Sequence, residues 1–400
     1  MMHRREVLGG LFAFMTGSEL IPKWAFAQSA QPVNRAAATR GTPAQERAFA
    51  AVHPIMEKLL LEFEIAGASL AIAHAGRLVV SKGYGLANVA KRVPVQPDTL
   101  FSIASVTKAI TGVAVLKLVD AGKLELDARL VDVLHDLKPL PGKRIADARF
   151  RNITVHHLLY HAGGFPGHVK SDQAEDIDME GEDTDKDADI ALRYRTLMSE
   201  PLEFAPGSQS HYSNIGFLVL RLVIEHAAGE GYEEYVRAKL LKPRGITRMH
   251  LETEGNYEPN EAHRYQAGGR KPARRMVANW LASATDLVHF LVAVDGGLGQ
   301  PFLSKKARTA MLAAPLPPNP KRPNAGHVGL GWDVVRQFPE GHRYAKSGGK
   351  PGIQAWLEHM ENGVDWAFLY NTNAPNGRSS RGETVKRMHE AFQKIVAKLH

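Results

Sequence analysis

Ser105 and Lys108 stand three residues apart at the start of a segment with helical periodicity. On a helix this spacing puts both side chains on one face, one turn apart. A helix N-terminus stabilises developing negative charge, and a desolvated lysine amine can take up a serine proton. The pair therefore suits nucleophilic catalysis. The same pattern recurs at Ser347–Lys350, but two glycines inside it and Pro351 after it disfavour a helix there.

A second motif, Tyr212-Ser213-Asn214, lies in a polar loop before a helical segment. A loop in this position can aim a phenol and an amide at one point. The phenol can shuttle a proton, and the amide can hold a substrate carbonyl or Lys108.

The third motif is the run Lys346, Ser347, Gly348 and Gly349, which we expect where a strand begins. A cation, a hydroxyl and a backbone without side chains suit the docking of a substrate along a sheet edge. Taken singly, each motif also has a structural interpretation: a helix N-cap for the serine of the first, a core aromatic for the tyrosine of the second, and a solvated charge for Lys346.

Apolar periodicity predicts the elements that position these motifs. The expected helices span 43–64, 105–120, 189–198, 215–227, 232–241, 285–295 and 383–399. The expected strands span 67–75 and 78–84, joined by a turn at Ala75-Gly76, and then 330–335, 353–357 and 366–370. Strands therefore occur near both ends of the chain and helices fill the middle. The simplest architecture is an antiparallel sheet built from both ends, with an inserted helical domain.

These elements predict a division into five regions. Residues 1–27 form a signal peptide and 28–42 a flexible lead-in. Residues 43–100 and 325–400 together form a sheet-containing α/β domain. Residues 101–324 form a helical domain, which carries an acidic insertion at 172–189.

The first residues resemble a twin-arginine export signal of bacteria. Arg4-Arg5 precedes an apolar stretch from Val7 to Met15, and Ala25-Phe26-Ala27 gives a small-x-small cleavage pattern. His3 and Val7 depart from the commonest residues of that motif. We expect a mature protein that begins near Gln28 in the periplasm or outside the cell; the alternatives are an uncleaved anchor and a basic start that arose by chance.

Composition excludes several classes of protein. The 400 residues include no cysteine, which excludes a disulfide framework, iron–sulfur clusters, Cys-ligated zinc and thiol catalysis. The only long apolar run is too short to span a bilayer, so no stable membrane insertion is expected. The net charge of +8 comes without a long basic tract or a nucleic-acid-binding motif, so no nucleic-acid partner is expected.

Two alternatives involve a metal ion. His157 and His161 are four apart on a predicted helix, and the acidic insertion partly resembles a calcium loop. No H-E-x-x-H motif accompanies the histidines, and the last calcium-loop position holds Asp187 in place of Glu. We therefore predict neither a metal nor another cofactor.

The three motifs, in this order, resemble those of the serine β-lactamase and penicillin-binding-protein superfamily. The most similar branch has S-x-x-K, Y-x-N and K-[TS]-G, and contains class C β-lactamases, D-stereospecific peptidases and related esterases. Three further stretches resemble the family pattern: Leu158–Gly164, Leu281–Leu287 and Gly329–Trp332. The resemblance covers nearly the whole mature chain.

The resemblance implies an α/β (α+β) fold of the β-lactamase/transpeptidase type: an antiparallel sheet flanked by helices, plus an inserted all-helical domain. It also implies a role for each motif residue. Ser105 would be the nucleophile, activated by Lys108 and Tyr212, either of which could be the base. Asn214 would position the substrate, and Lys346 would face a substrate carboxylate or support the tyrosine. The backbone N–H groups of Ser105 and Gly349 would form the oxyanion hole.

The expected function is exported serine hydrolysis of an ester or a D-amino-acid peptide through an acyl-enzyme. The substrate would be a small molecule or a fragment of peptidoglycan. Lys346, in place of a histidine, favours acyl groups that carry a carboxylate, whereas the surroundings of Tyr212 resemble those of peptidases and esterases. A class C-like β-lactamase and a non-catalytic binder of cell-wall fragments are the alternatives. No oligomeric state is predicted.

Overall fold

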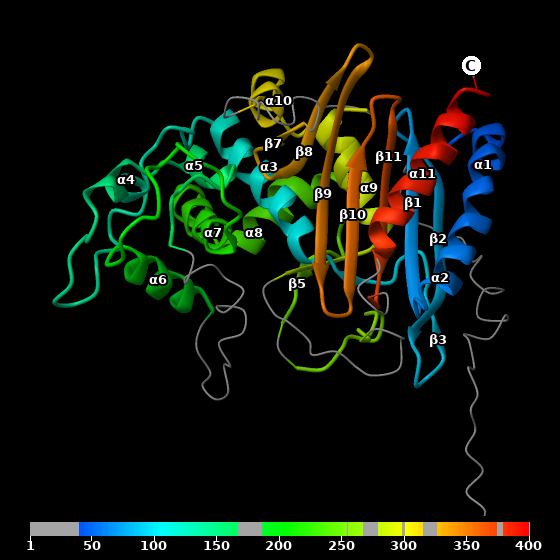
Figure 1. Cartoon of the computed structure of the whole chain (residues 1–400), viewed down its shortest axis with the longest axis horizontal. Helices are drawn as coiled ribbons and strands as arrows, with labels where there is room; N and C mark the ends of the chain where they lie inside the picture. The colour runs from blue at the N-terminus through cyan, green and yellow to red at the C-terminus, as the bar shows by residue number, and fades with distance from the viewer. Residues whose placement is uncertain are drawn as a thin grey trace, which may run out of the picture.

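The structure, a computed structural model, describes residues 40–166, 186–253, 255–266, 279–297, 301–314, 326–373 and 379–399. The predicted signal peptide, most of the predicted lead-in and the acidic insertion up to residue 185 lie outside these ranges. A large antiparallel sheet stands beside a mainly helical part of the chain (Figure 1). This confirms the predicted α/β fold class of the β-lactamase/transpeptidase type.

The large sheet has eight strands in the order β3-β2-β1-β11-β10-β9-β8-β7. Their bounds are β1 Gly67–His74, β2 Arg77–Asn88, β3 Val93–Pro94, β7 His327–Gly329, β8 Trp332–Phe338, β9 Gly341–Lys350, β10 Ile353–His359 and β11 Val364–Tyr370. The first strand of the chain pairs with the last, from Ala68↔Tyr370 to His74↔Val364. Strands from the two ends of the chain therefore form one continuous sheet, as the sequence predicts.

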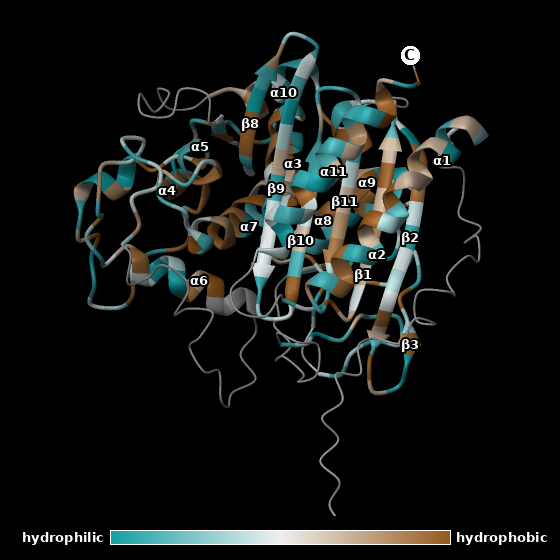
Figure 2. Ribbon diagram, turned by 45° about the vertical axis from the view of Figure 1, so that its right-hand side comes forward, coloured by the Kyte–Doolittle hydropathy of each residue, from teal (hydrophilic) through white to brown (hydrophobic). Residues whose placement is uncertain are grey.

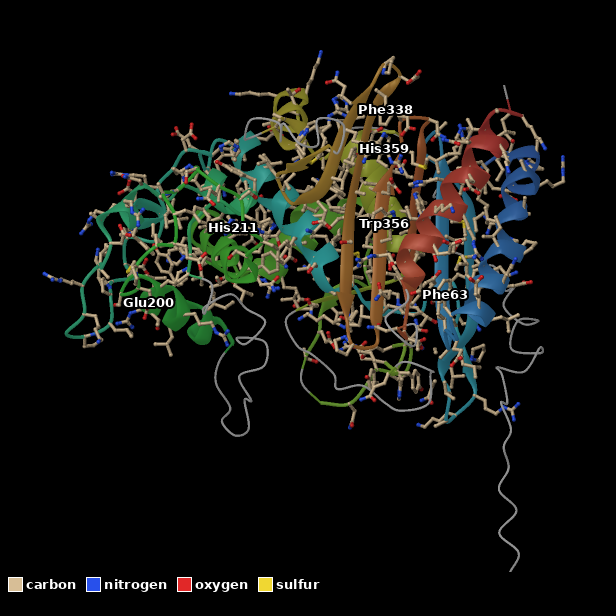
Figure 3. All side chains as sticks on the ribbon, viewed as in Figure 1. Phe63, Glu200, His211, Phe338, Trp356 and His359 are labelled. Carbon is tan, nitrogen blue, oxygen red and sulfur yellow. The ribbon has the colours of Figure 1, made fainter. Side chains whose placement is uncertain are left out.

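Two of the hairpins in this sheet show its register. The turn between β1 and β2 lies at Ala75-Gly76, as predicted, and both residues have positive φ (50° and 73°), which suits the right-handed twist of a hairpin. The β8–β9 hairpin pairs Phe338 with Gly341 and Val334 with Ala345. Figure 3 shows Phe338 toward its outer end. The sequence did not predict most of β9, since its first residues are polar or half-buried and do not alternate clearly.

Helices cover both faces of the sheet. The described helices are α1 Pro43–Phe49, α2 His53–Glu62, α3 Thr107–Asp120, α4 Leu130–Val133, α5 Val155–Leu159, α6 Lys186–Leu197, α7 Asn214–Ala228, α8 Tyr232–Val236, α9 Ala284–Asp295, α10 Lys305–Leu312 and α11 Ser380–Val396. None of them has the length and hydropathy that a bilayer-spanning helix needs. Two predicted helices are interrupted: a short 3₁₀ turn separates α1 from α2, and α8 continues as a π-helical turn at Arg237–Leu241.

Alternating side chains of β1 and β11 join two hydrophobic cores. Trp366 and Phe368 pack with α1, α2 and α11 on one face, while Ala367 and Leu369 pack with α3 and α9 on the other. In Figure 2 the outer helix α11 is largely teal, whereas the strand β11 behind it is largely brown. Because both faces of these strands are buried, they form the rigid centre of the fold.

The segment 101–324, expected to be all-helical, also contains a small sheet. Its strands β4 Phe101–Ser102, β6 Trp280–Ala282 and β5 His250–Leu251 lie in the order β4-β6-β5. Strands of two or three residues are too short to show an alternating pattern, which explains why the sequence did not predict them. The small sheet matters for function because β4 leads directly into the turn that contains Ser105.

Close packing of α3 against the β7–β8 turn predicts the effect of one substitution. A Cβ added at Gly112 would lie 2.8 Å from the carbonyl oxygen of Leu330, so Gly112→Ala should destabilise the protein by about 1–3 kcal/mol through overpacking. The matched control is Gly216→Ala in α7, where the nearest atom would be 3.4 Å away. The control should be neutral or stabilising, because alanine favours helices. Urea unfolding monitored by circular dichroism measures both changes, and equal effects would contradict this packing.

Candidate active site

Ser105 lies in a 3₁₀ turn, Ala104–Val106, that leads into α3. The sequence placed it at the first position of the α-helix; the regular helix begins two residues later. Ala104 has φ 45°, a left-handed conformation that costs an L-residue roughly 1–2 kcal/mol. This backbone turns Ser105 out of the core and leaves it half-buried, so the hydroxyl is both held and accessible.

Lys108 lies in the first turn of α3 and is only 8% exposed. Its Nζ donates to Ser105 Oγ at 3.3 Å and to Asn214 Oδ1 at 2.5 Å. The amine also lies 5.0 Å from the centre of the Tyr212 ring. These contacts satisfy a buried amine whose burial would otherwise be costly, and they bring the first two predicted motifs together.

Tyr212 lies in a loop whose end is fixed by the start of α7. Ser213 is the N-cap of that helix, and its Oγ accepts a hydrogen bond from the N–H of Gly216 at 3.1 Å. The phenol of Tyr212 donates to Ser105 Oγ at 2.7 Å. The tyrosine is 46% exposed, so it is not a core aromatic. It lies on the open side of the nucleophile.

The loop before Tyr212 is anchored to the turn that follows α5. Ser210 Oγ donates to the carbonyl oxygen of Tyr160 at 2.7 Å. The N–H of His211 donates to the carbonyl oxygen of His161 at 2.9 Å. The N–H of Ser213 then donates to His161 Nδ1 at 3.1 Å. Figure 3 shows His211 on the helical side of β9. The turn therefore holds the phenol in place, a function that the family resemblance alone did not indicate.

The ring of His161 packs against the ring of Tyr212. His161 lies beyond the end of α5 with φ 63°, not on a helix as predicted, and its ring lies 4.6 Å from that of Tyr212. Burial, followed by the charges of Lys346 and Lys108, lowers the pKa of His161 to about 3. His157 instead caps α5, where its Nδ1 accepts the N–H of Thr154 at 3.2 Å.

The third motif lies inside β9 and not at its start, because the strand begins at Gly341. A Cβ at Gly348 would lie 2.3 Å from the carbonyl oxygen of Ile103, so the missing side chain lets β9 pass directly against the Ser105 turn. The N–H of Ser347 points toward β8, where it donates to Asp333. Because alternate residues of a strand point their N–H groups to the same side, the N–H of Gly349 also points away from β10.

Asp333 is the site residue that sequence analysis missed. It lies on β8, where the hairpin register places it opposite Lys346. One carboxylate oxygen forms an ion pair with Lys346 Nζ; the other accepts the N–H of Ser347 at 2.9 Å and its Oγ–H at 2.6 Å. Burial opposes ionisation of this carboxyl, but the Lys346 charge and these hydrogen bonds hold its pKa below the ordinary value.

Lys346 itself is 1% exposed, and its Nζ lies 5.5 Å from the centre of the Tyr212 ring. Burial lowers the pKa of its ammonium group, and Asp333 opposes that shift. All the predicted site residues thus gather at one place, where β9 meets the Ser105 turn and the start of α7. The arrangement provides a hydroxyl with two adjacent proton-transfer groups and a second, ion-paired amine.

The profile of the Beta-lactamase family matches residues 50–391. Protein flp of Staphylococcus aureus strain N315 is 31% identical over 221 residues, which are 55% of this chain and 42% of that protein. Esterase EstB of Burkholderia gladioli is 35% identical over 196 residues, 48% of each chain. The matches thus span less than half the length of these relatives. The structure of D-alanine carboxypeptidase AmpC from Burkholderia cenocepacia has a TM-score of 0.67 at 20% identity, and covers 86% of this chain and 99% of that one; this likeness concerns the fold.

The low pKa of His161 predicts how stability depends on pH. The unfolded chain binds a proton on this histidine below pH 6.5, whereas the folded chain binds it only near pH 3. Stability is therefore lost as the pH falls between these values, by about 1.4 kcal/mol per pH unit. His161→Asn keeps a hydrogen-bond acceptor but does not titrate, so its free energy of unfolding should fall less steeply. Urea unfolding at pH 7, 6 and 5 measures the difference, and parallel curves would contradict the prediction.

Proposed function

Because this chain belongs to the Beta-lactamase family of serine hydrolases, we propose that it cleaves its substrate through an acyl-enzyme formed on Ser105. The observation that carries this proposal is the pair of contacts at Ser105 Oγ, with the phenol of Tyr212 at 2.7 Å and the amine of Lys108 at 3.3 Å. A nucleophile needs a neighbour that takes its proton, and here two groups lie within reach.

The chemistry follows from this geometry. Ser105 Oγ attacks the carbonyl carbon, and its proton passes to Lys108 or Tyr212, whichever of the two is deprotonated, as a neutral amine or as a phenolate. The bond to the leaving alcohol or amine then breaks, and the leaving group takes up that proton. Water attacks the acyl-enzyme in the second half and restores the hydroxyl. The N–H groups of Ser105 and Gly349 are our candidates for the oxyanion hole, supported by the strand direction and the close approach of β9.

We place esters first among substrates and D-amino-acid peptides second. The 35% identical relative EstB is an esterase, and the fold is shared with a D-alanine carboxypeptidase. A class C-like β-lactamase is the alternative function, and the Lys346-Ser347-Gly348 motif is the feature that favours it. A non-catalytic binder of wall fragments has no need for a lysine amine and a phenol on one serine hydroxyl, and this argues for catalysis.

Three substitutions test the catalytic assignment with p-nitrophenyl acetate as substrate. Ser105→Ala should lower kcat/KM by more than about 10³-fold, and Lys108→Met and Tyr212→Phe each by roughly 10²–10⁴-fold. Tyr194→Phe is the matched control, because the Tyr194 hydroxyl is buried in the helical part without a hydrogen-bond partner among the described residues. Release of p-nitrophenol gives all four rates. Turnover that survives Ser105→Ala would overturn the proposal.

We also propose that the protein is exported in the folded state to the periplasm and that the mature chain begins near Gln28. The support is the Arg4-Arg5 pair, the apolar stretch after it and the Ala25-Phe26-Ala27 pattern. N-terminal sequencing of the protein from a periplasmic fraction should find a start near Gln28, and replacing both arginines by lysine should keep the protein in the cytoplasm. A periplasmic protein that retains Met1 would contradict cleavage.

A further inference from the structure

The positive charge of the third motif, Lys346, is balanced by a carboxylate of the protein. Lys346 is expected to offer a positive charge, but its side chain is 1% exposed and its ammonium group forms an ion pair with Asp333. Asp333 lies directly across the β8–β9 hairpin, one position beyond the pair Val334↔Ala345. Opposite charges at such facing positions stabilise each other. The pair therefore belongs to the sheet and is held in place by its register.

Asp333 also engages the other donors of the motif. Ser347 has a single O–H, and it donates this group to Asp333 at 2.6 Å. The backbone N–H of Ser347 donates to the same carboxylate oxygen at 2.9 Å. Lys346 Nζ, the Ser347 N–H and the Ser347 O–H could each bind a substrate carboxylate. All three are already bound to the carboxylate of Asp333.

The consequence for an incoming substrate follows from Coulomb's law. A carboxylate brought close to Lys346 gains attraction from the ammonium group but meets a similar repulsion from Asp333, because the two protein charges lie within one ion pair. It also finds the Ser347 hydroxyl occupied. A neutral acyl group does not meet the repulsion, and it loses much less hydration free energy than a carboxylate does.

We propose that Asp333 sets the specificity of this site, so that the enzyme accepts acyl groups that are uncharged next to Lys346 and rejects those that carry a carboxylate there. This inference rests on the proposed serine hydrolase function and narrows its substrates to neutral esters. Asp333 acts through Lys346 and Ser347 and takes no part in bond cleavage.

The test compares two p-nitrophenyl esters that share one acyl chain and differ at its far end: the adipate monoester, which ends in a free carboxylate, and its uncharged methyl ester. The ratio of kcat/KM values for the two esters is measured after subtraction of the uncatalysed rates. The wild type should prefer the methyl ester. Asp333→Asn keeps an acceptor for the Ser347 N–H but removes the charge, so it should shift the ratio toward the anion by about 10- to 100-fold.

Two further variants separate charge from structure. Asp132→Asn removes an exposed carboxylate on α4 that pairs with Arg129, so it should leave the ratio unchanged. In the double variant Asp333→Asn/Lys346→Gln the shift toward the anion should disappear, because no cation is left to bind it. If Asp333 serves only to hold the strands, Asp333→Asn lowers both rates equally, and that result overturns the proposal.

Each of the remaining outcomes also supports or overturns the proposal. If Asp333→Asn fails to fold, as judged by circular dichroism, a wild-type preference for the neutral ester supports the proposal and a preference for the anion overturns it. If the wild type hydrolyses neither ester faster than Ser105→Ala does, the proposed hydrolase function fails, and this inference fails with it. Failure of the specificity alone appears as turnover of both esters without discrimination.

Discussion

A buried lysine amine is the constraint on which the site depends. An amine removed from water must find hydrogen-bond partners, and Lys108 finds them in Ser105 Oγ and Asn214 Oδ1. Asn214 is the first residue of α7, so this requirement draws the start of that helix to the start of α3. The loop before it then lies over the nucleophile, and His161 holds that loop by one hydrogen bond and one ring contact.

The second constraint is the charge balance around Tyr212. Two lysine amines lie within 5.5 Å of the centre of its ring, yet their surroundings differ. Lys108 contacts the nucleophile, whereas Lys346 is tied to Asp333 on the neighbouring strand. His161, the third basic side chain at this position, stays neutral because burial and the two lysines lower its pKa to about 3. The amine of Lys108 is therefore in contact with the nucleophile, whereas the charge of Lys346 is balanced by Asp333.

The sequence predicts the parts of this site that rest on local rules. Helix periodicity predicts that Ser105 and Lys108 share a face, and hairpin chemistry predicts the Ala75-Gly76 turn. The resemblance to a known family then predicts that the three motifs meet at one site. Asp333 and Lys346 are 13 residues apart in the chain. Their pairing depends on the register of β8 against β9, which local sequence patterns do not reveal. The first half of β9 was not predicted, because its half-buried residues do not alternate clearly. Once the register is known, however, the facing position of Asp333 follows at once.

The central claim is that acyl transfer passes through Ser105. The direct measurement is an acid quench during turnover of p-nitrophenyl acetate, followed by peptide mapping with tandem mass spectrometry. We expect one acetyl group, on Ser105, in the wild type and none in Ser105→Ala. An acetyl group on Lys108 or Tyr212, or steady turnover without any acylated peptide, would contradict it.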